Sequence, residues 1–141
     1  MARILSIDYG RKRCGLAVSD PLQLIAGGLA TVATAELAAW IANYMQREQV
    51  EQVVIGDPRQ PNGAPSENHH RVEQFVARWR KLFPQVPIVM YDERFTSVLA
   101  HRAMLDGGLS KKTRQDKALV DEVSATIILQ DYMRYKANTR L

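Results

Sequence analysis

Apolar and polar residues alternate over short stretches of the chain, in the period-two pattern that is typical of β-strands. The first two stretches are separated only by a basic turn around Gly10, which favours an antiparallel hairpin. The last two stretches end next to acidic residues. Five segments are predicted as strands: residues 3–8, 14–19, 28–33, 52–55 and 87–91.

In other segments, apolar residues recur three and four positions apart, as they do on one face of a helix. Four segments are predicted as helices: residues 35–49, residues 66–83, a segment from Thr96 or Ser97 to Gly107-Gly108, and residues 118–135. Short early connections require antiparallel strands, whereas strands that alternate with helices favour parallel pairing. We therefore expect one α/β domain over residues 1–141, with a mixed five-stranded sheet and helices on both faces. Its first three strands should be antiparallel and its last two parallel.

The composition is that of an ordinary globular protein, with 46% hydrophobic and 24% charged residues in a chain of 141. No apolar run approaches the roughly 18 residues that a membrane helix needs. Asp8 lies inside the apolar N-terminal stretch, which argues against a secretory signal. With one cysteine, Cys14, an internal disulfide is excluded, and this residue is expected to be packed in a strand. We expect a cytoplasmic protein.

Acidic residues follow three of the predicted strands. Asp8 ends the first strand, Asp57 follows the fourth, and Asp92 and Glu93 follow the fifth. In open α/β sheets, ligands bind outside the carboxyl ends of the parallel strands. One acid at a strand end is often only a turn former. Asp8 is more informative, because its strand is expected to be central and buried, where a carboxylate needs a partner or a metal.

The last predicted helix carries another acid, Asp121, in its first turn. Asp121 shares a helix face with Ala125 and Ile128, and this apolar face must pack on the sheet. The next residue, Glu122, points about 100° away and is better placed to compensate the helix dipole. Asp121 is therefore expected to face the sheet and its strand ends.

Converging carboxylates repel one another and cannot all be ionised without a cation. Oxygen ligands without nearby thiolates suit Mg²⁺ or Mn²⁺ rather than zinc. His69 and His70 lie on the second predicted helix, and no cysteine or acid has a suitable zinc-ligand spacing to them. With Mg²⁺ on a carboxylate cluster, the natural substrate is a phosphodiester. Two ions roughly 4 Å apart would activate water and stabilise the leaving oxygen.

Basic residues lie close to these acids along the chain. The net charge of +4 permits nucleic-acid binding without demonstrating it. An acidic site repels a polyanion, so basic rims are needed to hold the phosphates. Each basic cluster taken alone is also compatible with a solvated loop. The residues expected to bind nucleic acid are Arg11, Lys12, Arg13, Arg94, Lys111, Lys112, Arg114 and Lys117.

Four stretches of sequence are together specific for one protein family, because of their order, their spacing and the total length of the chain. They are residues 7–10 with 15–18, residues 54–58 with 62–63, residues 92–97, and residues 117–121 with 125–129. Together they resemble the YqgF/RuvX family, small bacterial proteins described as pre-16S rRNA nucleases and as Holliday-junction-resolvase homologues. The resemblance implies a ribonuclease-H-like fold. It also implies that Asp8, Glu93 and Asp121 are the catalytic and metal-binding acids.

The resemblance further implies a substrate and partners: the 5′ end of pre-16S rRNA, cut with Mg²⁺ (or Mn²⁺) during ribosome biogenesis, with ribosomal particles as further partners. The chain departs from the family pattern at two positions. Asp57 stands where the family usually has leucine, and Glu122 stands where it usually has a small residue. Other ribonuclease-H-like enzymes place their second carboxylate at the end of strand four. The second metal ligand is therefore open between Glu93, which ranks first, Asp92 and Asp57.

Three other functions are compatible with parts of the sequence. A Holliday-junction resolvase would use the same acids on branched DNA, which presents similar phosphates. A non-catalytic RNA-binding ribosome-assembly factor could retain the fold, although the acids are intact in all three family positions. The hairpin from Asp8 to Gly15 also resembles the phosphate-binding hairpin of actin-like phosphotransferases, but those enzymes need two such domains. Monomer and dimer are both open from the sequence.

Overall fold

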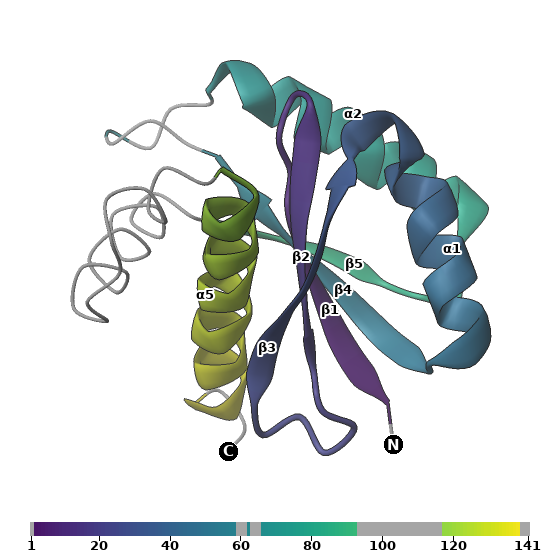
Figure 1. Ribbon diagram of the computed structural model, residues 1–141, viewed down its shortest axis with the longest axis vertical. Helices are drawn as coiled ribbons and strands as arrows, with labels where there is room; N and C mark the ends of the chain where they lie inside the picture. Colours follow the sequence, from purple (N-terminus) through teal and green to yellow (C-terminus); the bar gives the residue numbers. More distant parts are fainter. Residues whose placement is uncertain (1, 59–61, 63–65, 93–116, 139–141) are drawn as a thin grey trace.

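A computed structural model describes residues 2–58, 62, 66–92 and 117–138, and the remaining residues lie outside the description. The chain alternates strands and helices after an opening run of three strands (Figure 1). The elements are β1 (Arg3–Asp8), β2 (Arg13–Ser19), β3 (Ala26–Ala33), a 3₁₀ turn (Thr34–Glu36), α1 (Leu37–Arg47), β4 (Val50–Asp57), α2 (Glu67–Leu82), β5 (Ile88–Asp92) and α5 (Lys117–Asn138).

The five strands form one mixed sheet in the order β3-β2-β1-β4-β5. β2 pairs antiparallel with both β1 and β3, whereas β4 pairs parallel with both β1 and β5. The expected sheet, antiparallel in its first three strands and parallel in its last two, is confirmed. β1 lies in the middle, so the residue that ends it is flanked by β2 on one side and β4 on the other.

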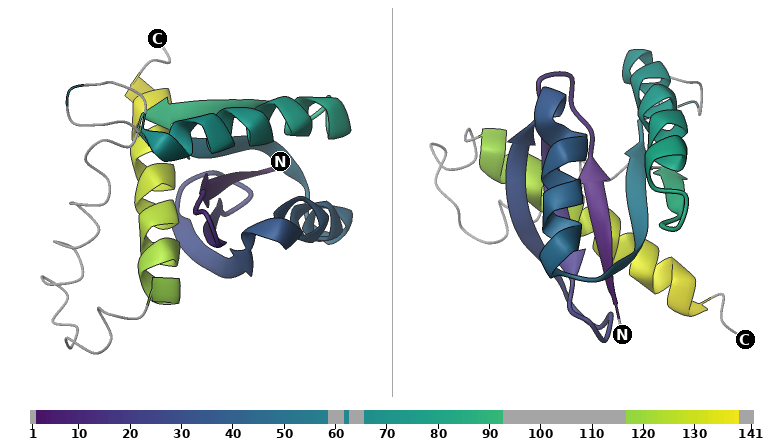
Figure 2. Two further views of the ribbon diagram at one scale, coloured as in Figure 1. Left: turned by 90° about the horizontal axis from the view of Figure 1, so that it is seen from above. Right: turned by 90° about the vertical axis from the view of Figure 1, so that its right-hand side faces the viewer.

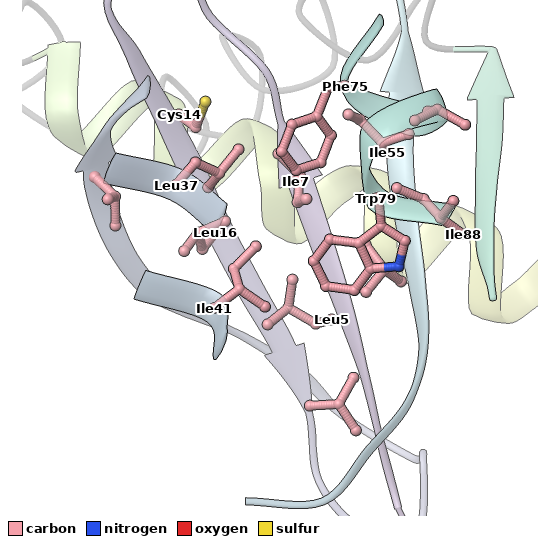
Figure 3. Packing of buried hydrophobic residues seen from close by; sticks show 14 of the residues in the cluster. Leu5, Ile7, Cys14, Leu16, Leu37, Ile41, Ile55, Phe75, Trp79 and Ile88 are labelled. Carbon is pink, nitrogen blue, oxygen red and sulfur yellow. The ribbon is translucent and has the colours of Figure 1, made fainter. Parts of the chain in front are cut away.

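Helices cover both faces of the sheet, as predicted. The views in Figure 2 show α1 and α2 on one face and α5 on the other. Alternation along β1 divides its side chains between these two layers. Leu5 and Ile7 pack under α1 and α2, together with Trp79 (Figure 3). Ile4 packs in a second cluster beneath the α5 residue Ile128. Because Ser6 and Asp8 share the parity of Ile4, they belong to the α5 face.

The element boundaries differ from the predictions by a few residues, for a physical reason. β4 runs from Val50 to Asp57, two residues beyond the predicted segment at each end. Main-chain pairing continues through polar positions that the apolar pattern does not mark, as in the register pair of Asp57 with Asp92. The helix expected from residue 96 or 97 to 108 lies outside the described residues. Within the described part of the chain, no helix is long and apolar enough to cross a membrane.

Candidate functional site

Asp8 and Asp121 come together at the carboxyl end of β1. Asp8 is half-buried on the α5 face. Asp121 lies one turn into α5 rather than in its first turn as predicted, because the helix begins at Lys117. Two features near these acids bring that helix close to the sheet. The Ser6 hydroxyl donates a hydrogen bond to the carbonyl oxygen of Ala125 at 2.7 Å. Gly15, the register partner of Asp8 on β2, lies beneath Asp121.

Gly15 allows this close approach because it has no side chain. A Cβ atom built at this position would lie 2.0 Å from the carbonyl oxygen of Asp121. Any other residue would therefore push the part of α5 around Asp121 away from β2 and from Asp8. In the sequence, Gly15 is part of a stretch that carries the family resemblance. Its structural role is to let α5, which carries Asp121, pack closely against the β1–β2 hairpin, which carries Asp8.

The two carboxylates influence each other electrostatically. Burial, and secondly the negative charge of Asp121, raise the pKa of Asp8 from 3.8 to about 7. Arg13 compensates the other carboxylate: its Nε atom donates to Asp121 Oδ2 at 2.6 Å. This contact joins residues that lie 108 positions apart, and no local sequence pattern indicated it. Arg13 was expected to bind nucleic acid, and in this structure it forms an ion pair with a carboxylate of the site.

These side chains are chemically suited to a hard divalent cation. They bring carboxylate oxygens together, without a thiolate, at a place where negative charge is costly. The Asp121 carboxylate is accompanied by one positive group, Arg13, whereas Asp8 has a raised pKa. Within the described part of the chain, the arrangement therefore has less positive charge than its carboxylates require. Among the described residues, however, no group of three potential ligands surrounds a single point.

Asp57 lies away from this pair. It shares its parity on β4 with Val53 and Ile55, which pack under α1 and α2, so its side chain is on the opposite face from Asp8. There its Oδ1 atom lies 2.6 Å from His69 Nδ1 in a buried pair. Asp57 is therefore at the carboxyl end of β4, as the sequence indicated, but its side chain points to the other layer.

His69 connects two carboxylates. Its Nδ1 atom faces Asp57, and its Nε2 atom lies 2.7 Å from Glu73 Oε1 one helical turn later. Both nitrogens can donate to carboxylates only when the ring is protonated. His69 was not predicted as a site residue, although one signal was present: it precedes the buried Val72 by three positions and so lies on the packed stripe of α2.

The remaining candidate residues from the sequence are exposed, buried or outside the described part of the chain. Asp92 is exposed at the end of β5, and Arg11 and Lys12 are exposed in the β1–β2 turn next to the site. Cys14 is buried, as expected. The predicted residues Glu93, Arg94, Lys111, Lys112 and Arg114, and the side chain of Lys117, lie outside the described residues.

The fold defines a class of proteins. A solved complex of the Fowlpox virus resolvase with Holliday junction DNA superposes with a TM-score of 0.56 at 12% identity, covering 95% of this chain and 98% of that chain. Thermus thermophilus RuvC, solved in complex with a Holliday junction substrate, gives a TM-score of 0.55 at 19% identity, covering 96% of both chains. At such identities the likeness concerns the fold alone. It is the ribonuclease-H-like fold that the sequence predicted.

Sequence comparison identifies the family. Residues 2–135 match the RuvX family model, described as Holliday junction resolvase, and the chain belongs to this family. A Bacteroides thetaiotaomicron protein named "Putative pre-16S rRNA nuclease" is 60% identical over 136 residues, covering 96% of this chain and 99% of that protein. Its namesake in Phocaeicola vulgatus is 57% identical over 136 residues, covering 96% and 98%. The family resemblance is confirmed, and these names describe nucleases, which are hydrolases of phosphodiester bonds.

Proposed function

We propose that this protein is a metal-dependent endonuclease that cuts structured RNA and matures the 5′ end of pre-16S rRNA in the cytoplasm. One observation carries the proposal: Asp8 and Asp121 meet at the carboxyl end of the central strand, where burial and mutual repulsion favour a bound cation. The choice of RNA is supported by the names of relatives that match nearly the whole chain.

The proposed metal is Mg²⁺ (or Mn²⁺), held by Asp8, Asp121 and Glu93. Glu93 is included on the strength of the family motif at residues 92–97. When bound, the metal would activate water and stabilise the leaving oxygen. The protein itself supplies the positions: Gly15 and the Ser6 hydrogen bond seat α5. The exposed cations of the β1–β2 turn would attract the phosphates of the substrate.

A second candidate function is favoured by a specific finding. The family model is described as Holliday junction resolvase, so branched DNA is the alternative substrate. The acids would act on either phosphodiester in the same way, and a direct comparison of substrates is required.

The test is a Mg²⁺-dependent cleavage assay on RNA carrying the 5′ leader of pre-16S rRNA, run beside a four-way DNA junction. Wild-type protein should cut the RNA, and Asp8→Asn and Asp121→Asn should bind RNA without cutting it. Glu122→Gln is the matched control, because it removes one negative charge from the same turn of α5. Cutting of the junction alone would favour the resolvase. RNA binding without cleavage by the wild type would favour a non-catalytic assembly factor acting on ribosomal particles.

A further inference from the structure

A cleft of about 350 Å³ opens beside the first turn after β1, on the face of the sheet opposite Asp8. Its lining residues are Tyr9, Arg71, Gln74, Phe75 and Arg78. Tyr9 directly follows Asp8 in the chain, so the cleft lies at the same sheet edge as the two carboxylates. Figure 1 shows α2, which supplies the other lining residues, crossing beside the β1–β2 turn.

The α2 residues of the cleft form a single stripe. Arg71, Gln74, Phe75 and Arg78 follow one another at the three- and four-residue spacing that places side chains on one helix face. Phe75 is buried, whereas the two arginines remain exposed. They stand two helical turns apart, about 10 Å along the axis. The cleft therefore has an aromatic base and a cationic group at each end.

Two contacts fix the cleft in place. The side-chain amide of Asn68 donates to the carbonyl oxygen of Tyr9 at 2.7 Å, which ties α2 to the end of β1. The rings of Tyr9 and Phe75 pack with their centroids 5.4 Å apart. Arg71 and Arg78 line the cleft together with Tyr9. The Tyr9 hydroxyl can donate a hydrogen bond.

We propose that this cleft binds the sugar-phosphate backbone of the RNA strand beyond the point of cleavage. Arg71 and Arg78 would each hold a phosphate, and Gln74 and the Tyr9 hydroxyl would donate to phosphate or ribose oxygens. All these groups can donate hydrogen bonds, and the described residues that line the cleft include no acid. The proposal rests on the proposed function, because it assumes that RNA is the substrate. The cleft would be a second positive surface, besides the β1–β2 turn. It would attract the RNA strand on the sheet face opposite Asp8 and Asp121, whose carboxylates repel it.

The test is RNA binding by a double variant, Arg71→Gln with Arg78→Gln, measured by fluorescence anisotropy with a short single-stranded RNA of mixed sequence. The measurement is made in the Asp8→Asn background, so that cleavage does not interfere. Two lost phosphate contacts should weaken binding roughly tenfold at low salt and reduce the slope of log K against log salt by about 1.4. The matched control, Arg80→Gln with Lys81→Gln, removes the same charge from the end of the same helix. It should change the slope far less.

The outcomes distinguish the two proposals. If the Arg71/Arg78 variant keeps the affinity and salt slope of its Asp8→Asn parent, or loses no more than the control, the cleft does not bind RNA. If the wild type binds RNA through the cleft but cuts neither RNA nor DNA, the proposed function fails and the proposal for the cleft stands.

Circular dichroism of both variants checks the fold. The charge-retaining pair Arg71→Lys with Arg78→Lys should keep most of the salt slope, because the slope depends on the number of phosphates that a Lys or Arg neutralises.

Discussion

Asp8 should destabilise the metal-free protein, because the fold places its carboxylate beside Asp121 and no cation of the described residues pairs with it. Its pKa is raised from 3.8 to about 7, and each pKa unit corresponds to about 1.4 kcal/mol. The full shift sets an upper limit of about 4 kcal/mol on the cost of the charged form. Asp8 is only half-buried and solvent screens part of the interaction. We therefore expect Asp8→Asn to raise the free energy of unfolding by about 1–2 kcal/mol at pH 8.

The stability of the protein depends on pH because Asp8 holds its proton up to a higher pH in the folded state than in the unfolded chain. Asp8 stays protonated up to about pH 7 in the folded protein but loses its proton near pH 3.8 in the unfolded chain. Between these values the folded state binds more protons, so the stability of the wild type falls as the pH rises. Above pH 7 the loss is complete. The amide that replaces the carboxyl group in Asp8→Asn does not titrate, so the advantage of this variant should be full at pH 8 and less than half as large at pH 5.

Urea denaturation in the presence of a chelator, at pH 5 and pH 8, measures this difference. Glu122→Gln serves as the control, because it removes a neighbouring negative charge that does not belong to the Asp8–Asp121 pair. Excess Mn²⁺ should stabilise the wild type more than Asp8→Asn, since a ligand stabilises only the state that binds it. The reasoning is refuted if Asp8→Asn is no more stable than the wild type at pH 8. It is also refuted if the advantage is equal at both pH values or is matched by Glu122→Gln.

Three further variants test the contacts around the site. Arg13→Gln should tighten Mn²⁺ binding a few-fold, because the guanidinium no longer pairs with the Asp121 carboxylate. Paramagnetic broadening should then begin at a lower Mn²⁺ concentration. Weaker binding would show that Arg13 supports the metal site. Gly15→Ala should cost about 1–3 kcal/mol in urea denaturation, since its Cβ would meet the main chain of α5; an unchanged midpoint would contradict this packing. Asp57→Leu should keep Mn²⁺ binding and RNA cleavage but cost about 1–3 kcal/mol, because the buried His69 loses one of its two carboxylate partners. A loss of cleavage as large as that of Asp8→Asn would instead place a metal ligand on β4.

The order of elements and the mixed sheet could be predicted from the sequence, because they depend on local periodicity and on the lengths of connections. A two-residue period marks a half-buried strand, and a short connection permits only an antiparallel neighbour. The positions of Asp8 and Asp121 were predictable for the same reason. Each lies on a strand or helix whose apolar face is evident from the spacing of its neighbours, such as Ile4 for Asp8 and Ala125 for Asp121.

The tertiary structure decided which of these acids face each other. Asp8 and Asp57 both end strands at one sheet edge, yet the phase of alternation sends Asp57 to the α2 layer, where it meets His69. The phase depends on which residues pack against each layer, and an apolar run that is buried on both faces does not reveal it. The Arg13–Asp121 ion pair is likewise a product of the fold, because it joins the second strand to the last helix. Sequence alone determined which residues could form the site, and packing between distant segments determined which of them met.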